Sequence, residues 1–154
     1  MPILLAMIML ATPDAAGFDL SGRTAIARLH GEGAQIYACE AKGESAPPVW
    51  TLREPIAILI DDGKTVGRHF VGPHWELDDG SLVEGHLLES RPGATAQDIP
   101  ILKLAITRNR GNGRLAQATE IYRLTTHGGA LSGSCGRVGA LRSVPYSADY
   151  LFIR

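Results

Sequence analysis

The chain has 154 residues, of which 45% are hydrophobic and 20% are charged, a balance typical of one globular domain and not of a disordered chain. Its 15 Lys and Arg residues nearly offset 16 Asp and Glu residues, and the charges are scattered along the sequence. Because nucleic-acid binding requires a basic stripe or patch, we expect no nucleic-acid partner.

An apolar run at residues 2–11 precedes the first charged side chain, Asp14. The run suits the hydrophobic region of a secretory signal, and it is too short for a membrane span of about 20 residues. No Lys or Arg precedes it, and cleavage after Ala16 would put Asp14 where a small residue is preferred, so a core strand is the alternative. We predict a signal peptide at residues 1–16, a single domain at residues 17–154, a periplasmic or secreted location, and no transmembrane span.

The two cysteines of the chain, Cys39 and Cys135, fit an exported domain. A bridge between them would close a loop of about 96 residues and stabilise the fold by about 4–5 kcal/mol in the chain-entropy model. The alternative is two buried free thiols. We predict the Cys39–Cys135 disulfide. Neither cysteine has a second cysteine at the short spacing that zinc fingers use, so we predict no structural zinc site.

Short runs of β-branched, aromatic and aliphatic residues alternate with Gly, Asp, Asn and Pro along the whole domain. In chain order, the predicted strands are residues 24–30, 34–41, 55–60, 65–71, 74–77, 82–88, 99–107, 115–125, 143–146 and 149–153. The predicted turns between them include Gly31-Glu32-Gly33, Asp62-Gly63, Gly72-Pro73 and Asp79-Gly80. About ten short strands with 18 glycines and 9 prolines predict an all-β fold, a single antiparallel β-barrel or sandwich.

Residues 65–86 combine three histidines, a tryptophan and an acidic cluster. If both turns of this segment have two residues, His69 pairs with Glu76 on one face of the sheet, and His86 points to the other face. His69 and His86 would then be two strands apart and could not converge on one ion, so we predict no metal site. A register shift by one residue would reverse this assignment of faces.

The pair His69 and Glu76 is the candidate catalytic site, since a carboxylate across from a histidine can orient the ring of a general base. The alternative is a cross-strand pair that only stabilises the sheet. The chain has no G-x-S-x-G elbow and no H-E-x-x-H pair. Gly111-x-Gly113 lacks the third glycine and the strand-to-helix setting of a dinucleotide site. We therefore expect no cofactor.

Seven pieces of the sequence carry a resemblance to a known family. They are GAQIYAC (33–39), VGRHFVGPHWE (66–76), DGS (79–81), DIP (98–100), IYRLTTHGG (121–129), Cys135 and VPYSADYLF (144–152). Together they resemble domain of unknown function 3455, found in exported bacterial and fungal proteins. The family pattern has Thr in place of His74 and Lys in place of His86, which argues further against a metal site using either residue.

The resemblance implies export and a β fold, and it implies no established activity. Besides His69 and Glu76, it marks a set of polar and aromatic residues that we take as candidate ligand-binding residues: Trp75, Asp79, Ser81, Arg123, Tyr146, Asp149 and Tyr150. Some members carry a malate dehydrogenase label, which this short chain without a βαβ dinucleotide unit does not support.

These features favour a binding protein over an enzyme. We expect an exported β-domain that binds a small molecule or a cell-envelope partner. One alternative is an enzyme that uses His69 and Glu76 as an acid–base pair in a barrel pocket. A second is a purely structural surface protein.

Overall fold

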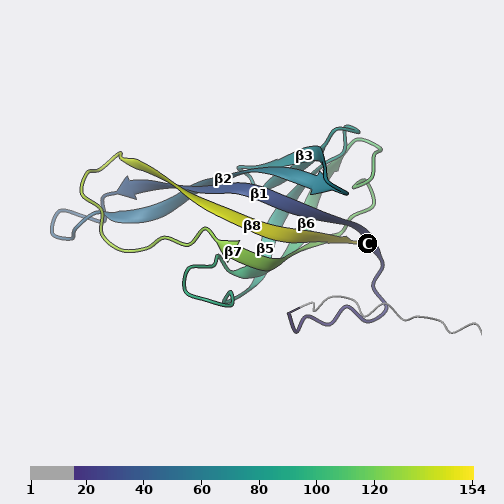
Figure 1. Ribbon diagram of the computed structural model, residues 1–154, viewed down its shortest axis with the longest axis horizontal. Helices are drawn as coiled ribbons and strands as arrows, with labels where there is room; N and C mark the ends of the chain where they lie inside the picture. Colours follow the sequence, from purple (N-terminus) through teal and green to yellow (C-terminus); the bar gives the residue numbers. More distant parts are fainter. Residues whose placement is uncertain (1–15) are drawn as a thin grey trace, which may run out of the picture.

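The computed structural model describes residues 16–154, so the predicted signal peptide, except for Ala16, lies outside the described residues. The strands are β1 (Ala25–Glu40), β2 (Val49–Asp61), β3 (Lys64–Phe70), β4 (His74–Leu77), β5 (Leu82–Arg91), β6 (Ile101–Arg110), β7 (Glu120–Gly128) and β8 (Leu141–Ile153). Each strand pairs antiparallel with the next, and β8 pairs with β1, which closes the sheet into a barrel (Figure 1). The predicted all-β antiparallel fold is confirmed.

The sequence predicted breaks at residues 31–33 and 147–148, but both lie inside continuous strands. β1 and β8 therefore each replace two expected strands. Gly31 and Gly33 lie within β1. A Cβ atom at Gly31 would come within 2.6 Å of the Tyr150 ring, and one at Gly33 would overlap the carbonyl of Ile56. These glycines therefore allow close approach of β8 and β2 to β1, and they make no turn.

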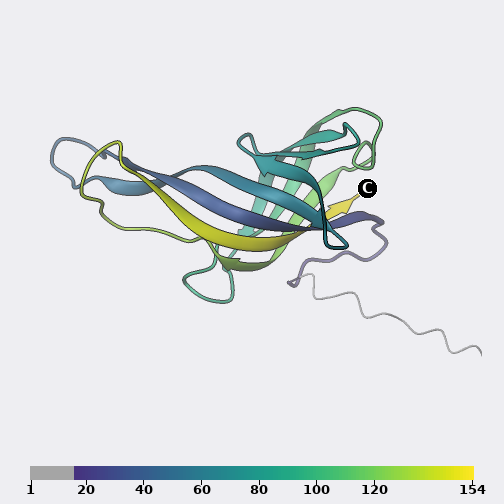
Figure 2. The same ribbon diagram turned by 45° about the horizontal axis from the view of Figure 1, so that its top comes forward.

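Three strands extend well beyond the rest of the barrel. β1, β2 and β8 have 16, 13 and 13 residues, whereas β3 has seven and β4 has four. Their outer ends form an extension at the left of the views in Figures 1 and 2. The predicted Cys39–Cys135 disulfide is present there, with Cα atoms 5.8 Å apart, and it joins the end of β1 to the segment that leads into β8.

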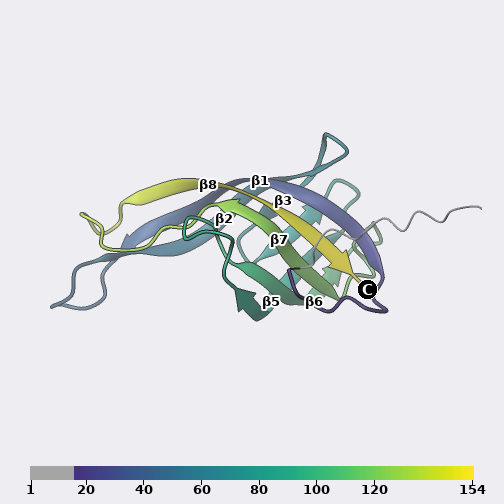
Figure 3. The same ribbon diagram turned by 60° about the horizontal axis from the view of Figure 1, so that its bottom comes forward.

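The strands bury apolar side chains on both faces of the barrel wall. The larger cluster fills the interior and includes Trp75, Ile121, Tyr150 and Phe152. The even-numbered aromatic residues of β8 thus share one face, as their alternation predicted. A smaller cluster lies on the outer face of β7 and β8, on the side turned forward in Figure 3, and the ring of Phe18 covers it.

Within residues 16–154, no helix is long and apolar enough to cross a membrane.

We expect the double variant Cys39→Ser/Cys135→Ser to lose about 4–5 kcal/mol of unfolding free energy, because the bridge closes a long loop in the unfolded chain. Urea denaturation of the variant beside the oxidised wild-type protein measures this difference. A loss below about 1 kcal/mol would contradict the chain-entropy account. It would show that the unfolded chain retains contacts that keep residues 39 and 135 near each other without the bridge.

Candidate functional site

A cavity of about 360 Å³ opens at the end of the barrel that carries the extension. All eight strands contribute to its wall. The polar and aromatic residues in the wall include Gln35, His69, Trp75, Arg123 and Tyr150, and the apolar ones include Leu52, Pro55, Val71, Leu87, Leu102 and Leu104. The volume falls in the lower part of the range of about 300–1,000 Å³ that small-molecule pockets occupy.

The connection between β3 and β4 decides which residues face this cavity. It has three residues, 71–73, where the sequence predicted two. As a result His69 lies opposite Trp75, and Arg68 lies opposite Glu76. The predicted pairing of His69 with Glu76 is therefore wrong by one residue. His69 points inward, and the Glu76 carboxylate binds Arg68 on the outer face at 3.1 Å.

The His69 ring is buried between other aromatic rings. It stacks on Trp75 with centroids 4.3 Å apart and lies 5.2 Å from the Tyr150 ring. Nδ1 lies 2.8 Å from the His74 carbonyl, which makes Nδ1 the protonated nitrogen and leaves Nε2 as an acceptor. Burial lowers the pKa of His69 to about 4, so the imidazole is neutral at neutral pH.

Arg123 projects from the inner face of β7 and is half-buried. Its Nε and Nη2 atoms donate to the Pro100 carbonyl at 3.0 and 2.8 Å, which fixes the guanidinium in place. Within residues 16–154, no carboxylate lies within ion-pairing distance of Arg123. Burial lowers the pKa of Arg123, and the nearby hydroxyls of Tyr150 and Tyr146 oppose that shift. The cavity therefore contains a positive charge that no described carboxylate neutralises.

Two further polar atoms in the wall are buried and unpaired. Gln35 is 2% exposed and Trp75 is 1% exposed, yet Gln35 Oε1 and Trp75 Nε1 have no hydrogen-bond partner within the described chain. Beside them, the hydroxyls of Tyr150 and Tyr146 lie 2.9 Å apart, and burial raises the pKa of both. Residues of the wall thus hold one unpaired acceptor and one unpaired donor, both almost without exposed area, and Tyr150 joins the wall to the hydroxyl of Tyr146 behind it.

Asp79 and Ser81 lie at the opposite, closed end of the barrel. Asp79 accepts hydrogen bonds from the backbone N–H and hydroxyl of Ser81 and from the backbone N–H of Arg114. These bonds, the one from Arg114 first, lower the pKa of Asp79. Ser81 Oγ in turn accepts from the N–H of Leu115, whose side chain is fully buried. The two predicted ligand residues therefore anchor the loop that closes this end.

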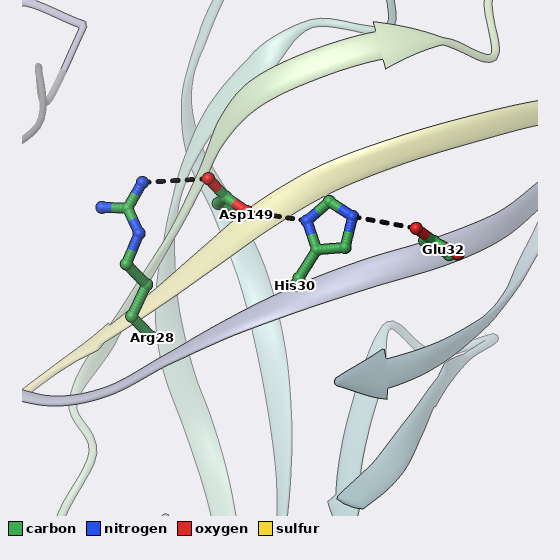
Figure 4. A network of polar contacts seen from close by, with 4 residues as sticks. All are labelled: Arg28, His30, Glu32 and Asp149. Carbon is green, nitrogen blue, oxygen red and sulfur yellow. Dashed lines mark hydrogen bonds and ion pairs between the residues drawn. The ribbon is translucent and has the colours of Figure 1, made fainter. Parts of the chain in front are cut away.

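Asp149 lies on the outer face of β8, away from the cavity. Figure 4 shows it between Arg28 and His30, at 2.9 Å from each, with the other nitrogen of His30 3.3 Å from Glu32. Burial pushes the pKa of Asp149 up, but the hydrogen bonds from His30 and Arg28 outweigh it and hold the pKa below its usual range. The contacts in Figure 4 form a chain along the barrel surface.

The structure thus brings together four of the nine predicted site residues, His69, Trp75, Arg123 and Tyr150, with Tyr146 behind Tyr150. It separates Glu76, Asp79, Ser81 and Asp149 from them. Sequence reasoning missed Gln35 and the leucines of the wall. The inward position of Gln35 could have been predicted, because strand alternation places it on the same face of β1 as the apolar residues Tyr37 and Cys39.

In the described part of the chain, no three His, Cys, Asp or Glu side chains are grouped so that they could hold a metal ion.

The fold and this cavity define a class of protein, an eight-stranded antiparallel barrel with a mostly apolar cavity at one end that contains a few polar groups. The family described as "Protein of unknown function (DUF3455)" matches residues 20–154, and the chain belongs to this family. No curated protein and no solved structure matches it.

Acidification tests the burial of His69. Its folded pKa lies below the value of about 6.5 in the unfolded chain, so the unfolded chain binds the proton first as pH falls. We expect stability to fall by about 2 kcal/mol between about pH 7.5 and pH 5, a window above the range where carboxylates titrate. Urea denaturation at the two pH values should show this loss in wild type and little of it in His69→Gln. An equal loss in the variant would contradict the assignment.

The role of Asp79 is tested by Asp79→Asn, with the exposed neighbour change Asp78→Asn as a control. We expect the first change to lower stability by about 1 kcal/mol, since it weakens charge-assisted hydrogen bonds, and the second to have no measurable effect. Thermal unfolding of the two variants gives the comparison. Equal melting temperatures would mean that Asp79 does not hold the closing loop.

Proposed function

We propose that this protein is a binding protein that holds one small ligand in the cavity at the barrel mouth. The observation that carries the proposal is an open and mostly apolar cavity with a few polar groups in its wall, among them the Arg123 guanidinium. Two residues of the same wall, Gln35 and Trp75, also hold buried polar atoms without a partner in the described chain. A few fixed polar groups in an apolar wall are the usual composition of a small-molecule site.

The energetic cost of the unpaired atoms supports this function. A buried polar group without a hydrogen bond costs about 1–3 kcal/mol, and folded proteins keep such groups rare. Both atoms have almost no exposed area, so a ligand would recover that cost by displacing the side chains that cover them and then donating to Gln35 and accepting from Trp75. Nε2 of His69 would supply a second acceptor. A purely structural barrel gains nothing from placing these groups around a space.

The acid–base alternative has less support, because the carboxylate that it requires lies outside the barrel. Glu76 binds Arg68 on the outer face, and His69 has only its neutral ring in the cavity. Binding without catalysis needs no partner for His69 beyond the ligand.

We further propose that the protein acts outside the cytoplasm, with residues 1–16 removed and a single domain from residue 17. The Cys39–Cys135 disulfide is consistent with an extracellular location. Phe18 supports the boundary, because its ring is 8% exposed and packs 5.1 Å from the Tyr122 ring. Ala16, the last residue of the segment proposed to be removed, also packs against this cluster, and its carbonyl accepts a hydrogen bond from Arg91. The described packing therefore begins at the proposed cleavage point.

Two neighbouring leucines provide a matched test of the cavity. Leu87 and Leu88 are 50% and 55% exposed, but only Leu87 lies in the cavity wall. Leu87→Trp should narrow the mouth and expel the ligand, whereas Leu88→Trp should leave binding intact. Native mass spectra of the proteins purified from their host, beside denatured spectra, report the bound mass. A wild-type protein that carries no bound mass, or a mass retained in Leu87→Trp, would contradict the proposal.

A further inference from the structure

We infer that the ligand is a compact organic monoanion, an apolar carboxylic acid whose carboxylate binds Arg123 while its apolar body fills the rest of the cavity. The inference rests on the proposed function, because it concerns the same cavity. It adds the charge and the chemical class of the ligand.

The charges around the cavity give the first argument. Three charged side chains line it, Arg53, Glu54 and Arg123. Nε of Arg53 lies 3.4 Å from a carboxylate oxygen of Glu54, so these two charges compensate each other at the rim. Arg123 therefore remains as the one uncompensated charge among the described residues of the wall. A partly buried cation without a counter-ion favours an anionic guest.

The hydrogen bonds of Arg123 give the second argument. The Pro100 carbonyl takes up Nε and one donor of Nη2, and the Tyr150 hydroxyl accepts a hydrogen bond from the same guanidinium. The guanidinium has five donors, so two remain for the two oxygens of a carboxylate. The protein thus fixes the orientation of the fork before a ligand arrives.

The remainder of the wall limits the ligand to one charge and an apolar body. Leu52, Leu87, Leu102 and Leu104 face the space, and the stacked pair of His69 and Trp75 presents a flat aromatic surface. Because His69 is neutral and Arg53 is already paired, the described wall offers no second cation for a phosphate dianion. The volume of about 360 Å³ has room for an apolar body such as an aliphatic chain or one to two aromatic rings, since a cavity of about 150 Å³ already holds benzene.

Calorimetric titration with matched acids and alcohols tests this inference on wild-type protein from which the bound ligand has been removed, with a native mass spectrum as the check of removal. The probes are octanoate with 1-octanol, and benzoate with benzyl alcohol. We expect at least one acid to bind roughly ten- to a hundredfold more tightly than its alcohol, the range for one charge-assisted hydrogen-bonding contact. Arg123→Gln should reduce the acid to the affinity of its alcohol. Arg108→Gln, on the exposed outer face, should change neither.

The outcomes separate the ligand class from the site. If an alcohol binds as tightly as its acid, and Leu87→Trp abolishes the binding of both, the anion assignment is wrong and the ligand site stands. If neither acids nor alcohols bind to wild-type protein, the assignment to a compact carboxylate is also wrong. The native mass spectra of the proteins purified from their host then show independently whether the cavity is a ligand site. Because the acid–alcohol comparison uses wild-type protein, it holds even if Arg123→Gln does not fold.

Discussion

The pairing of β1 with β8 is the contact on which the rest of the structure depends. It runs from Ala25 opposite Ile153 to Ala38 opposite Leu141, nearly the full length of both strands, and it joins the two ends of the chain. Without it the remaining strands would form an open meander with two free edges and no interior. The pairing also brings Gln35 and Tyr150, which are far apart in sequence, into one cavity wall. Gly31 makes this approach possible because it leaves room for the Tyr150 ring.

Much of the fold could be predicted from local patterns, because strand alternation and turn residues depend on neighbours in sequence. Asp62-Gly63 is a turn as expected, and Tyr146, Tyr150 and Phe152 share the inner face. Gly31 and Gly33 could not be interpreted in this way. A glycine marks either a turn or a close approach of another chain segment, and only the positions of β2 and β8 decide between the two. The sequence therefore overstated the number of strands.

The site was predictable only in part, for a related reason. A single extra residue between β3 and β4 exchanges the faces of every side chain on one strand, so His69 gained Trp75 as its partner and lost Glu76. Asp79 and Asp149 belonged to the same candidate set as Arg123, yet one binds a closing loop and the other lies on the outer surface. Arg123 is distinctive because no described carboxylate reaches it, and no pattern along the chain can show that.

The disulfide also determines what a protease could do to this chain. Strands β2 to β7 all lie between Cys39 and Cys135, so the covalent structure of the described chain is a ring with two tails. The tails are most of β1 and all of β8, and they pair with each other. A single backbone cut in any connection from β2 to β7 opens the ring but leaves both pieces joined by the bridge. Release of a fragment by proteolysis within the ring would take a second cut, so a nicked molecule keeps every strand of its barrel.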